Sequence, residues 1–309
     1  MVDVSIILVN YNTPKLTYEA ISSIVEKSLN FSFEIIVIDN SNNLEEFIYL
    51  RTIIPITIQI IDAKANLGFG KANNLGALHS NGKFLYFINT DTKLINNAIY
   101  ELLSFSMHHY PCIVGSNLYT KDLKPNHSFI PYERNAKNIK KSLSWLSILK
   151  RKIWRKRNDF NYSNKPLELD GYVCGASLMI PKEYFDKVNG FDKDIFMYAE
   201  DNLLCYELHK KYGMKLYNVP SSKIIHYEGG SFDNQSENHI KRIIDGNKVY
   251  FTKAYGKEDF VKFSSIMFNY YRKKTLVAFL LHQRKKKEVF YLCEEAYSKE
   301  MHTLLVNEK

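Results

Sequence analysis

The sequence predicts an α/β fold in which helices cover both faces of a mostly parallel sheet. Four short segments are almost continuously apolar and rich in Ile and Val, as strands buried on both faces are. The segments between them carry apolar residues at helical spacing, and strands that alternate with helices form a mostly parallel sheet. The strands are expected at Val4–Val9, Glu34–Asp39, Ile56–Ile61 and Phe84–Ile88.

The connections between these strands support the assignment. Pro14 precedes a helix whose apolar residues extend from Leu16 to Val25, and a second helix is expected near Leu44–Leu50. Asn66–Ala77 contains three glycines and is expected to run from a loop into a third helix.

The alternation becomes less regular after Asp91. Residues 120–166 are polar and basic and are expected to form a mobile insert, and residues from about 237 onward are expected to be helical. In this last region Phe263, Met267, Tyr270, Val277 and Leu281 fall on one apolar stripe. The other expected elements are a strand at Gly171–Ile180 ended by Pro181, a helix at Asp201–Tyr212 ended by Gly213, and strands at Lys215–Val219 and Lys223–Ile225.

Composition indicates a globular protein, with 309 residues of which 45% are hydrophobic and 24% charged. No segment approaches the ~20 uncharged apolar residues that a membrane span requires, and no signal peptide is expected. The four cysteines lie far apart and lack metal-site spacing, which is typical of thiols in a reducing compartment. We therefore expect a cytoplasmic protein.

The net charge of +9 is unevenly distributed. Basic clusters of this kind favour polyanions such as lipid headgroups, phosphates or nucleic acid, and the alternative is that they are solvated helix faces. The clusters are Lys150–Lys152, Arg155–Arg157, Arg272–Lys274 and Arg284–Lys287.

Acidic residues and one histidine stand where strands end or helices begin. Asp39 and Asp91 each follow a strand, Glu200 and Asp201 open a helix, and His226 follows the last strand. Ligands bind beyond the carboxyl ends of parallel strands, so this edge is expected to hold a nucleotide, a cation and a proton acceptor.

Asp39 is expected to accept hydrogen bonds from a base or a ribose, and its alternative is a turn-forming aspartate. Asn10 and Asn12, on either side of Tyr11, are expected to present amides and a ring to a nucleobase; their alternative is an ordinary turn before Pro14.

The glycine-rich loop has Gly68 and Gly70 and then Gly76, which lacks the spacing of a dinucleotide site, so a nicotinamide cofactor is rejected. Lys71 and the helix N-terminus are candidates to contact a diphosphate. The alternative for Asn73 and Asn74 is capping of the helix start.

Asp91 is the candidate metal ligand, beside the weaker neutral ligand Asn89; its alternative is the N-cap of a helix starting near Leu94. Asp201 is the candidate general base, and its alternative is a pure N-cap. His226 is expected to bind metal or phosphate, or else to be a loop histidine with its hydrogen bonds satisfied.

Taken together, these segments resemble the glycosyltransferases of family 2, in particular the bacterial rhamnosyltransferase-like branch, over residues 3–235. Such enzymes have the GT-A fold, which is Rossmann-like. The blocks that carry the resemblance are Val4–Thr13, Val37–Asn40, Asn66–Gly76 with Ile88–Thr92, and Gly175–Asp201 with His226–Ser231.

The resemblance implies a role for each site residue. Asp201, with Glu200, would act in catalysis, and Asp91 with His226 would hold Mg²⁺ or Mn²⁺. The residues that would contact the nucleotide sugar are Asn10, Tyr11, Asn12, Asp39, Gly68, Lys71, Asn74, Thr90, Gly175 and Ala176. The chain departs from the family pattern at Asn89, which replaces the first acid of an Asp-x-Asp motif, and at Leu203, where a further Asp often follows the Glu-Asp pair.

The implied activity is inverting transfer of a sugar from a nucleotide-diphosphate donor, first dTDP-rhamnose and next a UDP-hexose, to a lipid-linked surface-polysaccharide intermediate. The implied organisation is a nucleotide-sugar-binding half at 1–115, an acceptor-binding half at 116–235 and a basic helical extension at 236–309. The basic clusters, together with Trp145, Trp154 and Phe268–Tyr271, would bind the anionic inner face of the cell membrane.

Two other classes of protein compete with this interpretation. A non-catalytic nucleotide-sugar-binding or assembly protein is left open by Asn89 and Leu203. A nucleic-acid-binding protein would need basic residues at the binding edge, where this chain has acids, so no nucleic acid partner is expected. The sequence makes no prediction of oligomeric state.

Overall fold

The computed structural model describes residues 2–154, 156–227 and 236–306. The chain forms two compact units, each discontinuous in sequence. The sheet unit comprises Met1–Tyr132, Arg157–Phe196 and Glu200–Ser231. The helical unit comprises Glu133–Lys156, Met197–Ala199 and Phe232–Lys309.

Within its described residues the sheet unit contains a nine-stranded sheet with the order β3-β2-β1-β4-β10-β6-β11-β5, and β8 pairs with β11. The pairs among β1 to β4 and the β6–β11 pair are parallel, whereas β10, β5 and β8 are antiparallel to their neighbours. The fold is therefore the expected mostly parallel α/β fold. The strands are β1 Val4–Asn10, β2 Phe33–Asp39, β3 Gln59–Asp62, β4 Phe84–Ile88, β5 Thr92–Leu94, β6 Cys112–Tyr119, β8 Leu167–Leu169, β10 Ser177–Pro181 and β11 Lys215–His226.

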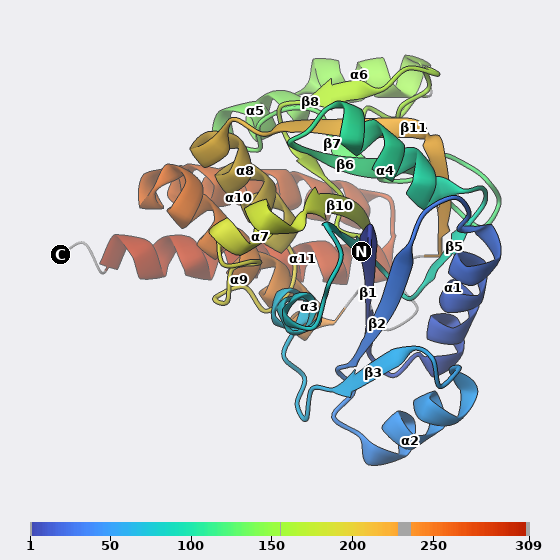
Figure 1. The fold of residues 1–309 in the computed structure, drawn as a ribbon. Coiled ribbons are helices and arrows are strands. Elements are labelled where there is room, and N and C mark those ends of the chain that lie inside the picture. The colour runs from blue at the N-terminus through green and yellow to red at the C-terminus, as the bar shows by residue number, and fades with distance from the viewer. Residues whose placement is uncertain (1, 155, 228–235, 307–309) are drawn as a thin grey trace. The chain divides into compact units, whose positions relative to one another are not determined.

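The central strands are buried on both faces. In β1, Ile6 and Leu8 belong to one apolar cluster and Ile7 belongs to the other, because successive side chains of a strand point to opposite faces. The first cluster includes residues of α1 (Pro14–Lys27) and α4 (Ala98–His108), and the second includes residues of α7 (Lys182–Lys187) and α8 (Glu200–Tyr212). Figure 1 shows β3, β2 and β1 side by side, with α1 beside them.

The remaining elements of the sheet unit are α2 (Leu44–Ile53), α3 (Phe69–Leu78) and a small sheet of β7 (Phe129–Ile130) and β9 (Tyr172–Val173). Three expected boundaries are wrong. Strand β3 starts at Gln59, because Ile56 follows Pro55 in a turn and is 97% exposed. The strand expected at Gly171–Ile180 is two strands, β9 and β10, and the two expected at 215–225 are one strand with a register shift.

The region expected to form an insert, residues 120–166, contains regular structure. This region contains β7, α5 (Ala136–Ser142) and α6 (Trp145–Trp154), and it buries the side chains of Phe129, Ile139 and Phe160. The sequence shows no periodic apolar pattern here, because these buried residues are separated by many polar ones.

The helical unit contains α5, α6, α9 (Glu237–Tyr255), α10 (Lys257–Leu280) and α11 (Arg284–Val306), as the sequence predicts for residues beyond 237. Its core stacks Phe251 on Phe263 with ring centroids 4.3 Å apart, and the Arg134 guanidinium lies over both rings. The predicted stripe on α10 is buried only in part: Phe263 is inside, whereas Val277 and Leu281 are more than half exposed.

None of the described helices is both long and apolar enough to cross a membrane. The cysteines are free thiols; Cys112, Cys205 and Cys293 are buried and Cys174 is half-buried. Of the expected membrane-contacting residues, Trp145 is exposed, while Arg155 and the side chains of Lys150–Lys152 and Trp154 lie outside the described part of the chain.

Candidate active site

Three groups of polar side chains make up the site, and we call each of them a station. The first station is the pair Asn10 and Asp39, which end adjacent parallel strands and are register partners. Oδ1 of Asp39 accepts hydrogen bonds from Asn10 Nδ2 at 2.8 Å and from Ser41 Oγ at 2.7 Å. Oδ2 of Asp39 is buried and has no hydrogen-bond partner among the described atoms. A buried acceptor without a partner costs free energy, so this oxygen is available for a ligand donor.

Asn10 holds Asp39 rather than presenting its amide outward. Its Oδ1 accepts a hydrogen bond from Thr17 Oγ1 at 2.8 Å, so both ends of the amide are engaged within the protein. Asn12 has a φ of 54°, and its backbone N–H donates to Ser41 Oγ at 2.9 Å. Asn10 is the last residue of β1, and Asn12 lies in the bend that follows it. Tyr11 between them is half-buried next to Asn10.

The glycine-rich loop lies next to the same station. The Leu67 N–H donates a hydrogen bond to Oδ1 of Asn40, the residue after Asp39, at 2.7 Å. Gly68 has a φ of +81°, and a Cβ there would lie 2.1 Å from the Phe196 carbonyl oxygen, so only glycine fits. Lys71 is exposed on α3.

Asn74, one of the residues expected to contact the donor, has its amide occupied. Its Nδ2 donates to the Phe191 carbonyl and its Oδ1 accepts from the Phe191 N–H, both at 2.8 Å. It does not cap α3, whose N-cap is Gly68.

The second station joins Asp91, His226 and Asn89. His226 Nε2 lies 3.3 Å from Asp91 Oδ1 and 3.3 Å from Asn89 Nδ2, and His226 Nδ1 is buried without a hydrogen-bond partner. The pairing of β5 with β11 brings these residues together, because Thr92 is opposite His226. Asp91 is not a helix N-cap: residues 92–94 form β5, and α4 begins at Ala98.

This station has one carboxylate and one imidazole as strong donors. No group of three or more His, Cys, Asp or Glu side chains that could hold a metal ion occurs among the residues the structure describes. A cation here would take its other ligands from substrate phosphates, water and the neutral Asn89.

The third station is Asp201, the second residue of α8. Its Oδ2 accepts a hydrogen bond from the Gly175 N–H at 2.9 Å, and its Oδ1 accepts one from the Asn202 N–H at 2.8 Å. The turn between β9 and β10, closed by Ser177 N–H to the Cys174 carbonyl, presents the Gly175 N–H to the carboxylate. The interruption of the expected strand therefore builds part of the site.

Glu200 differs from Asp201 in environment. It is buried, and its Oε2 has no hydrogen-bond partner among the described atoms. Burial, and then the charge of Asp201, raise the pKa of Glu200 to about 8. Glu200 is therefore mostly protonated at neutral pH and does not compete with Asp201 as a proton acceptor.

Contacts between neighbouring segments connect the three stations along one edge of the sheet. Thr13, three residues after Asn10, lies 3.4 Å from the hydroxyl of Thr90, and the Asn89 N–H donates to the Ala176 carbonyl at 3.3 Å. Gly175, next to Ala176, then holds Asp201. The acids at 39, 91 and 201 thus lie along one edge, as the positions of Asp39 and Asp91 after strands and of Asp201 at a helix start predict.

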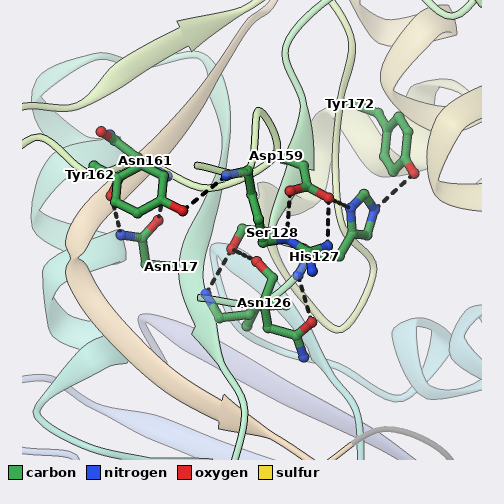
Figure 2. Close-up of polar contacts among 10 residues, drawn as sticks. Asn117, Asn126, His127, Ser128, Asp159, Asn161, Tyr162 and Tyr172 are labelled. Carbon is green, nitrogen blue, oxygen red and sulfur yellow. Dashed lines mark hydrogen bonds and ion pairs between the residues drawn. The ribbon is translucent and has the colours of Figure 1, made fainter. Parts of the chain in front are cut away.

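A network around His127 adjoins this edge and was not foreseen. Figure 2 shows His127 between Asp159 and Tyr172: Nδ1 lies 2.9 Å from Asp159 Oδ2, and Nε2 lies 3.1 Å from the Tyr172 hydroxyl. Burial opposes ionisation of Asp159, but hydrogen bonds from His127 and Arg157 hold its pKa well below its usual range.

The residues on either side of His127 contact two of the stations. Asn126 Nδ2 donates to the His226 carbonyl at 3.4 Å, and the Ser128 carbonyl accepts from the Cys174 N–H at 3.1 Å. No local pattern marks such a network, since His127 and Asp159 are 32 residues apart in polar sequence.

Comparisons with known proteins agree with this fold. Residues 5–188 match the family described as "Glycosyl transferase family 2". Because the match covers more than half of the chain, the protein belongs to this family and is a glycosyltransferase.

Two curated relatives are rhamnosyltransferases by name. The chain is 33% identical over 70 residues to N-acetylglucosaminyl-diphospho-decaprenol L-rhamnosyltransferase of Mycobacterium tuberculosis, which is 23% of this chain and 22% of the relative. It is 38% identical over 65 residues to Rhamnosyltransferase WbbL of Escherichia coli, which is 21% of this chain and 24% of the relative. The matched segment spans less than a quarter of either relative's length.

A solved structure, GalNAc-T7 with UDP, GalNAc and Mn²⁺, has a TM-score of 0.57 and 16% sequence identity, over 82% of this chain and 50% of that one. At this identity the likeness shows the fold alone. The fold is that of a GT-A glycosyltransferase.

Proposed function

We propose that the protein transfers a sugar from a nucleoside-diphosphate donor, with inversion at the anomeric carbon, to a hydroxyl of a lipid-linked saccharide. One observation carries the proposal. The Asp201 carboxylate, held by the Gly175 N–H, belongs to the same sheet edge as Asp39 and the Asp91–His226 pair.

Asp39 suits the nucleoside part of the donor. Its Oδ2 is a buried acceptor without a partner, and a pyrimidine imide N–H or a ribose hydroxyl is a donor of the right kind. Uracil and thymine share this imide N–H, so Asp39 accommodates both UDP and dTDP. The names of the two curated relatives favour rhamnose over a hexose as the transferred sugar. We propose dTDP-rhamnose as the first donor to test and a UDP-hexose as the next.

Asp91 and His226 suit a divalent cation beside the diphosphate. The Asp91 carboxylate and the His226 Nε2 face one another, and His226 Nδ1 is buried without a partner. When bound, such a cation neutralises the charge that develops on the leaving diphosphate. Mg²⁺ prefers oxygen ligands, so the imidazole favours Mn²⁺ of the two ions.

Asp201 suits the role of general base. Its two oxygens are oriented by the N–H groups of Gly175 and Asn202. The pKa of the neighbouring Glu200 is raised by burial and by the charge of Asp201. In the reaction the acceptor oxygen forms a bond to the anomeric carbon while the bond from that carbon to the diphosphate oxygen breaks. The acceptor proton moves to Asp201, which leaves a neutral glycoside and a nucleoside diphosphate.

The acceptor is proposed by analogy with the Mycobacterium tuberculosis relative, whose name specifies a diphospho-decaprenol carrier. A lipid-linked acceptor would place the enzyme at the cytoplasmic face of a membrane, as a peripheral protein. The basic composition of the chain is consistent with that surface.

A donor panel tests the proposal. The purified protein is incubated with dTDP-rhamnose and UDP-hexoses, with Mg²⁺ or Mn²⁺ and a short-chain lipid-diphosphate saccharide. NMR then reports the anomeric configuration of any product, and inversion is expected. Retention would contradict the direct displacement, and binding of donors without transfer or hydrolysis would favour a non-catalytic sugar-nucleotide binder.

A further inference from the structure

The turn between α10 and α11 exposes a group of large apolar side chains. Leu276, Val277, Phe279, Leu280 and Leu281 are each between 53% and 64% exposed. Helix α10 ends at Leu280 and α11 begins at Arg284, so these side chains surround the end of a helical hairpin. We call this group, with its flanking basic residues, the hairpin tip.

The exposed apolar residues are not needed to hold the hairpin together. The core between the two helices is made by other side chains: the rings of Tyr271 and Tyr297 are stacked with centroids 6.0 Å apart, and Ala278, Cys293 and Tyr297 are buried. A helical hairpin that already has a core gains nothing from five further apolar side chains in water.

The charge around the tip has a single sign. Residues 272–287, which include the turn, contain seven Lys or Arg residues, and no Asp or Glu occurs between Asp259 and Glu288. Two of the basic side chains lie over aromatic rings: the Lys287 Nζ is 5.1 Å from the Phe279 ring centroid, and the Lys274 Nζ is 4.7 Å from that of Tyr270. The seven residues are Arg272, Lys273, Lys274, Arg284, Lys285, Lys286 and Lys287.

We propose that the hairpin tip binds an anionic membrane surface, with its apolar side chains in the boundary between headgroups and acyl chains and its basic side chains on lipid phosphates. Amphipathic segments bind bilayers by this combination of apolar burial and electrostatic attraction. The tip is far too short to span a bilayer, which fits the finding that no described helix could do so.

The apolar residues decide between an anionic membrane and other partners. A nucleic acid backbone would engage the basic residues but would leave the leucines in water. A second copy of the tip would bury the leucines but would bring seven positive charges against seven others. A surface that is anionic outside and apolar beneath satisfies both groups of side chains.

This inference deepens the proposed function, on which its biological meaning rests, since a lipid-linked acceptor would be presented at such a surface. The binding itself requires neither donor nor acceptor. The two proposals can therefore fail separately.

Flotation with vesicles tests the inference on the full-length protein. Vesicles of phosphatidylglycerol with phosphatidylcholine are compared with vesicles of phosphatidylcholine alone. The apolar variant carries Phe279→Ser, Leu280→Ser and Leu281→Ser; the charge variant carries Lys285→Glu and Lys286→Glu. A control variant carries Ile56→Ser and Leu78→Ser, two exposed apolar positions in the sheet unit.

The wild type and the control are expected to float with the anionic vesicles and to remain behind with the neutral ones. Both tip variants should bind the anionic vesicles at least about tenfold more weakly, with an unchanged thermal unfolding midpoint because the substituted side chains are exposed. Transfer to a water-soluble acceptor should be the same in all four proteins.

Three results would overturn the inference. The first is that the apolar variant binds anionic vesicles as tightly as the wild type. The second is that the wild type binds a DNA duplex but no vesicle. The third is that the wild type binds no vesicle and sediments as a dimer, while the apolar variant sediments as a monomer. If the wild type floats but transfers no sugar from any donor to the short-chain lipid-diphosphate saccharide, the proposed function fails and the membrane surface stands.

Discussion

The backbone N–H of Gly175 donates a hydrogen bond to Oδ2 of Asp201 at 2.9 Å, across 26 residues of sequence. This bond holds the carboxylate of α8 against the turn between β9 and β10. A Cβ at position 175 would lie 3.4 Å from both Cβ and Oδ2 of Asp201, so the turn approaches the carboxylate about as closely as an ordinary side chain allows. The position of the proposed base is therefore set by a glycine in a different part of the chain.

Asp201→Asn should abolish transfer and leave donor binding nearly unchanged. An amide keeps the shape of the side chain but cannot accept the acceptor's proton, so a loss of about 10²–10⁴-fold in kcat is expected. Steady-state rates and donor Kd by calorimetry check this. Asp122→Asn, at an exposed loop position, serves as the matched control. Wild-type turnover by Asp201→Asn would remove this residue from the mechanism.

Asp39→Asn should weaken donor binding. The substitution replaces a carboxyl oxygen by an amide nitrogen, and losing a hydrogen bond to a carboxylate costs about 1.5–3 kcal/mol, or roughly 10- to 100-fold in Kd. Asp62→Asn is an informative control, because Asp62 is the register partner of Asp39 on β3 but bonds Lys64 at 2.7 Å. Equal donor affinities for the two variants would argue that Asp39 only forms the turn with Ser41.

Asp91→Ala should weaken donor binding by at least about tenfold in the presence of Mn²⁺ and should make the remaining binding insensitive to chelator. Removing the carboxylate leaves His226 as the one strong protein ligand of this station. Titrations of donor with Mn²⁺, with Mg²⁺ and with EDTA measure the effect, and the wild type should respond to EDTA. If EDTA changes neither protein, Asp91 does not hold a cation.

Glu200 should make the protein less stable as pH rises from about 4.5 to about 8. The folded protein keeps a proton on Glu200 that the unfolded chain releases near pH 4.5, because burial raises the pKa in the folded state to about 8. Raising the pH favours unfolding wherever the unfolded chain binds fewer protons than the folded protein. The free energy of unfolding therefore falls as pH rises across this window. Thermal unfolding midpoints at a series of pH values should show this slope in the wild type.

Glu200→Gln provides the comparison for that slope. The amide cannot ionise, so the variant should lose stability less steeply between pH 5 and 8, whereas Glu45→Gln, at an exposed position of α2, should follow the wild type. A Glu200→Gln slope identical to that of the wild type would mean that Glu200 is not the protonated group.

Asp159→Asn should destabilise the protein at neutral pH by about 1–3 kcal/mol, since the carboxylate accepts hydrogen bonds from His127 and Arg157. The lowered pKa of Asp159 stabilises the fold above the ordinary pKa of an aspartate, and this contribution is lost as pH falls below about 4. The difference between variant and wild type should therefore shrink in acid. Tyr172→Phe, which removes one neutral hydrogen bond, should cost less, and a constant difference down to pH 2 would contradict the ion pair.

The strands and the helix that carry the site residues were largely predictable from the sequence. The apolar runs of β1, β2 and β4 and the helix α8 were found because burial and helical spacing are local properties of a few neighbouring residues. Because parallel strands end at one edge, the placement of Asp39 and Asp91 after strands also predicted that they lie along a common edge.

Other features depended on partners far away in the chain. Asn74 looked like a donor contact or a helix cap, but its amide bonds Phe191, 117 residues away. Gly171–Ile180 looked like one strand, although a turn inside it presents the Gly175 N–H to Asp201. The His127 network lies in sequence that looked like a mobile insert.

By itself, the sequence determined which segments become strands and helices and which chemical groups stand at their ends. The tertiary structure decided which of those groups are occupied within the protein, as in Asn10 and Asn74, and which are left available, as in Oδ2 of Asp39. The physical reason is that backbone preference and the periodicity of apolar residues depend on a few neighbouring residues. A hydrogen bond instead requires a partner within about 3 Å, and only the folded chain determines which residue that is.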